Sequence, residues 1–196
     1  KANAYGHGAV EVSRACLDAG ADLLGVANID EAVELQQSGI NAQILILGCS
    51  LVNYAEEIVN RDIISTVCES SLAQAMSDAA MQYGKTARIH VKIDTGMGRI
   101  GIHSDDTFDF IKGLSALPGL QVDGVFTHFP CADECDKAFT ASQISVFRGI
   151  IDGLRKQYKV RLCHASNSGG ILAFPEADFD AVRPGIIVYG LYPSQD

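Results

Sequence analysis

The chain has 196 residues, of which 47% are hydrophobic and 20% charged, and its formal net charge is −9 at pH 7. This composition is typical of a folded globular domain and excludes a disordered or collagen-like chain. The acidic balance argues against a nucleic-acid or anionic-lipid surface, because each phosphate contact would need a lysine or arginine. The apolar runs at 44–47 and 185–192 are far shorter than the roughly 18 residues of a membrane-spanning helix. We therefore expect a small-molecule partner, no nucleic acid and no membrane contact.

Segments that are typical of strands alternate with helical segments along the whole chain, which is an α/β pattern. The helical segments show apolar stripes, and Asn28 and Ser104 are candidate N-caps. The candidate strands are short apolar runs, as expected for strands buried on both faces. They cover residues 22–27, 43–48, 62–67, 87–93, 121–127, 161–165 and 179–183.

Seven strands separated by helices favour an eight-stranded (β/α)8 TIM barrel, with a doubly wound open sheet as the alternative. The chain opens on Lys1 and has no closing element after Tyr192. We therefore expect residues 1–196 to form one barrel domain that is truncated at its N-terminus, a fragment of a longer protein. Barrel closure predicts that polar residues just after each strand converge on one face.

The six cysteines, at 16, 49, 68, 131, 135 and 163, include no CxxC pair. This pattern fits reduced thiols, and we expect a cytoplasmic location. The side chains of His128, Cys131 and Cys135 resemble metal ligands in type, but a second pair at zinc-finger spacing is missing. We therefore expect no metal.

The last two connections after predicted strands contain the parts of a phosphate-binding site. The segments 166–170 (SNSGG) and 184–186 (PGI) provide small side chains, hydroxyls and backbone N–H groups at a position where barrels commonly bind phosphate. Glycine and serine also form ordinary turns, and the segments alone fit both interpretations equally. Lys1 at the barrel mouth favours the site, because a partly desolvated amine can attack an aldehyde. A phosphate site with a lysine suggests pyridoxal phosphate (PLP) as cofactor.

The segment 96–101 (GMGRIG) matches the GxGxxG pattern of dinucleotide-binding folds and follows a predicted strand. That fingerprint normally lies in the first strand-to-helix turn of its fold, whereas a long α/β segment precedes this one. The next helix is expected to begin only at Ser104. We therefore interpret the segment as a flexible loop that presents Arg99 to an anion.

Five ordered motifs of this chain resemble the barrel domain of bacterial alanine racemase, a family of PLP enzymes. The match runs from one end of the chain to the other, and its first motif is the most specific. The motifs are residues 1–8 (KANAYGHG), 92–101 (KIDTGMGRIG), 127–129 (THF), 164–170 (HASNSGG) and 182–186 (VRPGI). Pro130 and Cys131 depart from the small residue that the family often has after this third motif.

The resemblance implies that Lys1 holds PLP covalently and later acts as a catalytic base on one face of the substrate. It also implies that the cofactor is held by Tyr5, His128, Asn167, Ser168, Arg183, Gly185 and Ile186, most of them around the phosphate. Arg183 would face the pyridine nitrogen, where a permanent positive charge disfavours protonation of the ring.

Further roles follow from the same resemblance. Arg99 would contact the cofactor's phenolic oxygen and the substrate carboxylate, and Lys92 matches a lysine that is carbamylated in some members. His128 would help to orient the second catalytic base, and His164 would support Arg183. An ordinary barrel lysine paired with Asp94, and a structural histidine at 128, are the alternatives.

The activity that the resemblance implies is PLP-dependent interconversion of L- and D-alanine, which supplies D-alanine for peptidoglycan. Racemisation needs two bases on opposite faces of one carbon. In the family the second base is a tyrosine from a following β-rich domain, delivered across a dimer interface. We therefore expect a homodimer for the full-length protein and no activity for this chain alone. A serine or broad-specificity racemase, a barrel decarboxylase and a non-catalytic PLP-binding barrel are the alternatives.

Overall fold

The computed structural model describes residues 2–194, so Lys1 lies outside the described residues. The chain forms two compact units. The N-terminal unit comprises residues 2–89 and Ser115–Gln121, and the C-terminal unit comprises His90–Leu114 and residues 122–194. Strand β4 (Ala87–Asp94) begins in the first unit and ends in the second.

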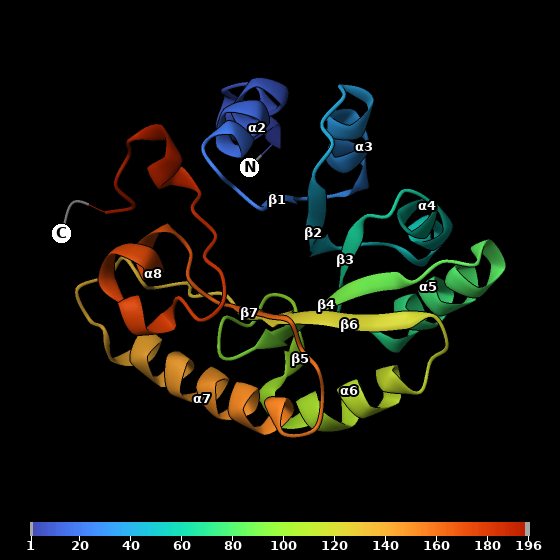
Figure 1. The fold of residues 1–196 in the computed structure, drawn as a ribbon. Helices are drawn as coiled ribbons and strands as arrows, with labels where there is room; N and C mark the ends of the chain where they lie inside the picture. The colour runs from blue at the N-terminus through green and yellow to red at the C-terminus, as the bar shows by residue number, and fades with distance from the viewer. Residues whose placement is uncertain (1, 195–196) are drawn as a thin grey trace. The chain divides into compact units, whose positions relative to one another are not determined.

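Parallel strands alternate with helices in the N-terminal unit (Figure 1). Strand β1 (Leu23–Val26) pairs with β2 (Gln43–Cys49), which pairs with β3 (Ile64–Val67). All four residues of β3 are buried, as the apolar pattern predicts. The helices of this unit are α1 (Ala2–Gly6), α2 (Ala9–Asp18), α3 (Ile29–Gln37), η1 (Val52–Tyr54), α4 (Ala55–Asn60) and α5 (Ser70–Tyr83).

The start of α3 confirms the predicted cap. The Asn28 side chain accepts a hydrogen bond from the Glu31 amide at 3.0 Å, and the Glu31 carboxylate accepts one from the Ala27 amide at 2.7 Å. This reciprocal pair satisfies amides that the first helical turn leaves without partners. It fixes the direction in which the chain leaves β1, so that Ala32 and Leu35 are buried.

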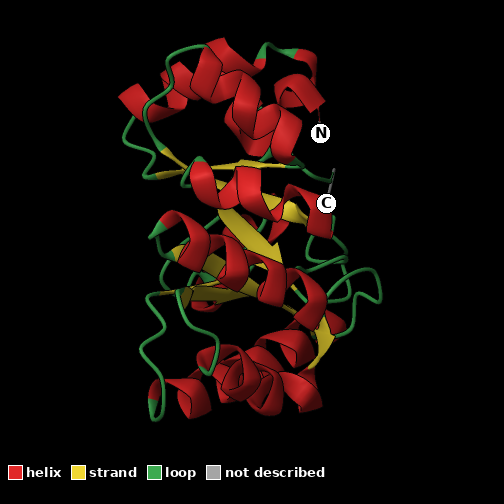
Figure 2. Cartoon of the chain, turned by 90° about the vertical axis from the view of Figure 1, so that its right-hand side faces the viewer, coloured by secondary structure: helices red, strands yellow, loops and turns green. Residues whose placement is uncertain are grey.

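Strands and helices also alternate in the C-terminal unit (Figure 1). Figure 2 shows the helices and strands of the described chain in separate colours. The strand order of the C-terminal unit is β4, β6 (Leu120–Phe126) and β7 (Leu162–His164), and the two-residue strand β5 (Ile102–His103) pairs with β4. Strands β6 and β7 are parallel, with Phe126 opposite His164. The helices are η2 (Ser104–Asp106), α6 (Thr107–Ser115), α7 (Ala138–Arg155), α8 (Ser168–Ala173), η3 (Pro175–Ala177) and η4 (Ile186–Tyr189).

Helix α7 is the long helix of the C-terminal unit. Its predicted apolar stripe, Ile144, Phe147, Ile151 and Leu154, is buried, which confirms that the stripe belongs to the core. Within residues 2–194, no helix combines the length and the apolar character needed to cross a membrane.

The predicted strand at 179–183 is wrong. The segment forms only an isolated bridge between Ala181 and His164, because Phe179 has a positive φ of 46° that breaks the extended chain. Individual bonds hold it beside β7 instead: the Cys163 amide donates to the Asp180 carboxylate at 2.8 Å, and the Arg183 amide donates to Ser166 O at 2.9 Å. Arg183, at the end of this segment, still lies at the carboxyl end of β7.

Candidate functional site

The segment around Tyr5 has an unusual backbone. Asn3, Ala4 and Tyr5 have φ values of 51°, 52° and 59°, which is the left-handed helical region. Each such residue costs roughly 1–2 kcal/mol when it carries a side chain. The Asn3 side chain stabilises the turn by accepting a hydrogen bond from the Ala9 amide at 2.7 Å. Strain of this kind gathers at functional sites, so the turn is a candidate part of the site in the N-terminal unit.

Arg183 is held by groups at the ends of β6 and β7. Its Nη2 donates to Thr127 O at 2.8 Å and to Ala165 O at 2.7 Å, and its Nη1 donates to His164 Nδ1 at 2.6 Å. Desolvation lowers the pKa of Arg183 to about 10, so the guanidinium stays charged at neutral pH. Both Nη2 hydrogens are used on carbonyls, and the remaining N–H groups can face a ligand.

Asn167 connects the end of β7 to the loop after β6. Its side-chain oxygen accepts a hydrogen bond from the Gly170 amide at 3.0 Å, which caps α8, and its Nδ2 donates to Phe129 O at 2.8 Å. The same Nδ2 lies 3.5 Å from His128 Nε2. Arg183 Nη2 lies 3.4 Å from the other ring nitrogen of His128. The structure therefore brings together three predicted site residues, His128, Asn167 and Arg183.

Ser168 and the segment after Pro184 converge at the start of α8. The Ser168 hydroxyl oxygen accepts hydrogen bonds from the Gly185 amide at 3.0 Å and the Ile187 amide at 3.5 Å. Ile186, between the two donors, begins η4. Because the oxygen accepts these bonds, the Ser168 O–H can donate to an anion. The Ser168 hydroxyl at the start of α8 is therefore a candidate phosphate donor.

Two buried histidines extend from Arg183 into the core. His164 Nδ1 accepts from Arg183, which can only donate, so a neutral His164 carries its proton on Nε2. That nitrogen lies 2.9 Å from His90 Nδ1, which must accept. His90 therefore carries its proton on Nε2, which lies 3.9 Å from Asp123 Oδ2. The always-protonated guanidinium thus fixes the tautomers of both imidazoles.

The pKa values support neutral rings. Burial lowers the pKa of His90, and burial together with Arg183 lowers the pKa of His164 well below its usual value. His90 and Arg161 together hold the pKa of Asp123 far below its usual range. Arg161 reaches the same carboxylate with two donors, at 2.8 Å to Oδ2 and 3.1 Å to Oδ1. The polar chain (Arg183, His164, His90, Asp123) therefore ends on an ionised carboxylate, whose other partner, Arg161, has a side chain that is 52% exposed.

Gly124 in β6 leaves room for the His90 ring. A Cβ at this position would lie 2.7 Å from His90 Cε1 and 2.7 Å from Leu162 O. We expect Gly124→Ala to lower the free energy of unfolding by about 2 kcal/mol, because the crowded ring and backbone must shift. Urea denaturation measures this loss. Gly113→Ala is the matched control, since a Cβ there meets nothing within 4 Å, and an equal loss in both variants would contradict the prediction.

Lys92 lies inside the C-terminal unit beside the polar chain. Its side chain is buried, and its Nζ lies 4.7 Å from the centre of the Phe126 ring. The same ring stacks on His164, with centroids 4.8 Å apart, and lies 5.4 Å from the Arg183 guanidinium carbon. The Phe126 ring therefore contacts Lys92 and Arg183 and stacks on the imidazole.

The loop of residues 96–101 follows β4 and carries Arg99, which is exposed. The Asp94 carboxylate shapes the loop by accepting hydrogen bonds from the Gly96 amide at 2.8 Å and the Gly98 amide at 2.9 Å. The loop leads into β5, and an α-helix begins only at Thr107. A dinucleotide fingerprint needs a helix directly after its glycines. The dinucleotide interpretation is therefore excluded.

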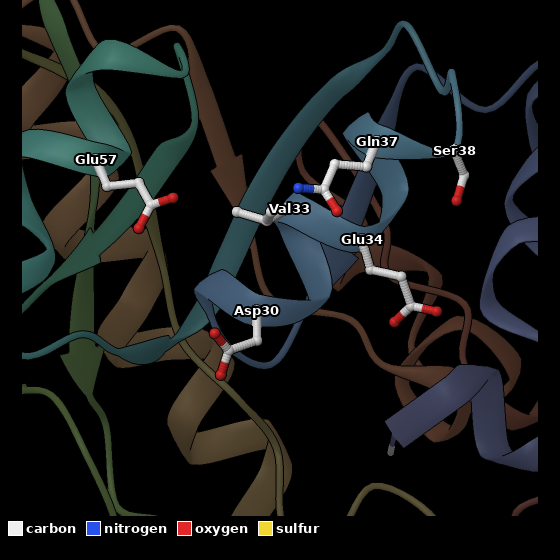
Figure 3. A pocket seen from close by; sticks show the side chains of 6 residues that line it. All are labelled: Asp30, Val33, Glu34, Gln37, Ser38 and Glu57. Atoms are coloured by element: carbon white, nitrogen blue, oxygen red, sulfur yellow. The ribbon is translucent and has the colours of Figure 1, made fainter.

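Among the described residues, neither a metal-binding group nor the groove between α3 and α4 is a candidate functional site. Within residues 2–194, no three His, Cys, Asp or Glu side chains are grouped so that they could bind a metal ion. An open groove of about 300 Å³ lies between α3 and α4, lined by Asp30, Val33, Glu34, Gln37, Ser38 and Glu57 (Figure 3). Its three carboxylates would repel a phosphate.

Comparison with known proteins places the whole arrangement in one family. Residues 1–193 match the family model described as "Alanine racemase, N-terminal domain". The chain belongs to this family. The α/β barrel class and the resemblance predicted from the sequence are both confirmed.

Curated and structural relatives agree with the family. The alanine racemase of Clostridium perfringens (strain SM101 / Type A) is 46% identical over all of this chain and 51% of its own length. The solved alanine racemase of Clostridium difficile 630, in complex with cycloserine, matches with a TM-score of 0.95 and 39% identity over 99% of this chain and 54% of that one. The Bacillus anthracis alanine racemase with bound L-Ala-P matches with a TM-score of 0.90 and 36% identity, over 98% and 50% of the two chains. The chain thus spans about half the length of the curated relatives it matches.

Sequence reasoning missed His90 and Asp123. His90 lies in an apolar strand, and no local motif surrounds Asp123. The only signal available was an ionisable residue in each of two buried strands, which needs a buried partner. Lys1 lies outside the described residues, and the roles of Lys1, Tyr5, Arg99 and Lys92 stay predictions.

Proposed function

We propose that the protein containing this chain is a PLP-dependent alanine racemase that interconverts L- and D-alanine. The proposal rests on the position of Arg183 at the ends of β6 and β7, close in sequence to the Ser168–Gly185 contact. It is supported by the match of residues 1–193 to the alanine racemase N-terminal domain. The relatives named above are all called alanine racemase, which favours alanine over serine as the substrate.

The donor groups of the C-terminal unit fit PLP. A phosphate dianion needs N–H and O–H donors. The amides of Gly185 and Ile187 donate to the Ser168 oxygen, which leaves the Ser168 O–H to donate to a phosphate oxygen. A pyridine nitrogen that accepts a hydrogen bond needs a donor that never loses its proton, and Arg183 meets that need. We propose that Tyr5, Asn167 and Ile186 complete the phosphate site.

Bound PLP supplies an aldehyde carbon that binds amines and an electron-withdrawing ring that acidifies the α-proton of an amino acid. In our proposal, the Lys1 amine holds the cofactor and then removes or returns the proton on one face of Cα. The Arg183 guanidinium keeps the ring nitrogen unprotonated, since a second positive charge beside it is unfavourable. This limits how much negative charge the ring accepts and disfavours side reactions such as transamination.

The remaining roles concern the substrate. We propose that Arg99 binds the substrate carboxylate, with Lys92 as a residue that carbamylation would convert into an anionic partner for an arginine. His128, held near Asn167 and Arg183, would orient the second base, which we assign to a part of the protein outside residues 1–196. We further propose that the full-length protein is a cytoplasmic homodimer.

Reduction with borohydride tests the assignment of Lys1. The full-length protein, loaded with PLP, is reduced, digested and mapped by mass spectrometry. We expect the phosphopyridoxyl label on Lys1 alone. Lys92 is the internal control, because its amine is buried in β4 and no role in holding PLP is assigned to it. A label on Lys92 or on another lysine would overturn the site.

Ser168→Ala tests the phosphate cluster. We expect PLP affinity to fall about tenfold or more, since a hydrogen bond to a charged phosphate contributes about 1.5–3 kcal/mol. Fluorescence titration of the apoprotein with PLP measures the change. Ser142→Ala is the control, because the Ser142 hydroxyl donates to Phe139 O on the exposed side of α7. Equal affinities of the two variants would contradict a role for Ser168.

A further inference from the structure

Strand β2 changes register before it ends. Ile46 lies opposite Ser65, but the next paired residues are Cys49 and Thr66, so β2 bulges between Ile46 and Cys49. The Thr66 hydroxyl holds the bulge by donating to Ile46 O at 2.7 Å. Bulges redirect side chains at the ends of strands.

Gly48 lies inside the bulge. A Cβ at this position would lie only 2.5 Å from Ala27 O, so only glycine allows the close approach to the end of β1. The bulge is therefore a feature that the local packing requires.

The bulge brings two thiols into contact. The Sγ atoms of Cys49, the last residue of β2, and Cys68, the first residue after β3, lie 3.1 Å apart. Cys49 is exposed, and Cys68 is half-buried. A disulfide has an S–S distance of about 2.05 Å, so closing the bond needs a movement of about 1 Å. Both residues lie in the N-terminal unit, at the carboxyl ends of their strands.

We propose that Cys49 and Cys68 are a redox-active dithiol that forms a reversible disulfide. The thiolate of the more exposed Cys49 attacks a small-molecule disulfide, such as oxidised glutathione, and releases one thiol. Cys68 then attacks the mixed disulfide at Cys49 and releases the second thiol. Two protein thiols are oxidised to a disulfide, their two protons pass to the two thiolates that leave, and one small-molecule disulfide is thereby reduced to two thiols. A resolving cysteine in contact with an accessible one is typical of redox-sensitive sites.

Two other cysteines of the chain have raised thiol pKa values, which makes them less reactive. Burial raises the pKa of Cys163 to about 12, and the Glu134 carboxylate raises the pKa of Cys131. Both shifts reduce the thiolate fraction, which is the reactive form. In an α/β barrel the carboxyl ends of the strands form the active-site face. A disulfide there would link the ends of two strands at that face.

Disulfide mapping tests the proposal on the full-length protein. The native protein is treated with oxidised glutathione, alkylated to block remaining thiols, digested without reduction and analysed by mass spectrometry. We expect one cross-linked peptide that joins Cys49 to Cys68, a mass lower by two hydrogens, and full reversal by dithiothreitol. Cys49→Ser should abolish the cross-link, whereas Cys135→Ser, at another exposed cysteine, should leave it intact.

The proposal is overturned if Cys49 and Cys68 are recovered on separate peptides, each alkylated or carrying glutathione. A cross-link of either residue to one of the other four cysteines would overturn it equally. The test uses the unmodified protein, so its outcome does not depend on whether a variant folds. It also measures no racemase activity or PLP binding, so that its failure and the failure of the proposed function are distinguishable.

Discussion

Replacing Arg183 with alanine is expected to reduce racemisation by at least about a hundredfold and to lower the free energy of unfolding by about 3 kcal/mol. The guanidinium donates to Thr127 O, Ala165 O and His164 Nδ1, and alanine leaves all three acceptors without this donor. Each buried acceptor that loses its partner costs about 1–3 kcal/mol, and water that enters the space recovers part of the loss. The larger effect is on activity, because the donor proposed to face the pyridine nitrogen is lost.

Arg183→Lys is the matched control for charge. Lysine keeps the positive charge but offers a single ammonium group in place of the planar fork that reaches two carbonyls and an imidazole. We expect it to recover part of the stability and little of the activity. Urea denaturation and a racemase assay on the full-length protein measure the two quantities. If alanine retains the activity of the unaltered protein, Arg183 has no role in the reaction.

The strands were the most predictable part of the fold. Six of the predicted segments contain a strand, because parallel strands buried on both faces are short apolar runs bounded by polar residues. The segment 179–183 was also predicted as a strand, but Phe179 has a positive φ of 46°, and the segment makes only individual hydrogen bonds, such as that of the Asp180 amide to Cys163 O. Strand β5 has only two residues, too few to leave a periodic pattern.

Some residues of the candidate site were named from the sequence, and others were found only in the structure. The roles proposed for Ser168, Gly185 and Arg183 came from the resemblance to the family, because glycine and serine after strands also form ordinary turns. The partners of Arg183 were harder to predict, because His90 reaches His164 only through the order of β4, β6 and β7. A histidine within an apolar strand gives no sign of which strand lies beside it. The position of Cys68 beside Cys49 depends likewise on a register shift that the sequence does not reveal.

Acid is expected to destabilise the C-terminal unit through the buried imidazoles. The pKa values of His90 and His164 are lowered in the folded chain from an ordinary value of 6.5. Above pH 6.5 neither state binds these protons. Below it the unfolded chain binds these protons more readily than the folded chain, so each imidazole lowers the free energy of unfolding by up to about 1.4 kcal/mol per pH unit. The lowered pKa of Asp123 stabilises the fold above its ordinary value of 3.8 and adds no loss between pH 6.5 and about 4.5.

His90→Asn tests whether the titration of His90 causes this pH dependence, because asparagine keeps the hydrogen bond but does not titrate. Its side-chain oxygen can accept the proton of His164 Nε2 but cannot itself be protonated. We expect the slope of unfolding free energy against pH, measured by urea denaturation of the apoprotein between pH 6.5 and 5, to fall by up to about 1.4 kcal/mol per pH unit. A His90→Asn curve that runs parallel to that of the unaltered protein would show that His90 binds a proton equally in both states, and the neutral tautomers assigned to the polar chain would then be wrong.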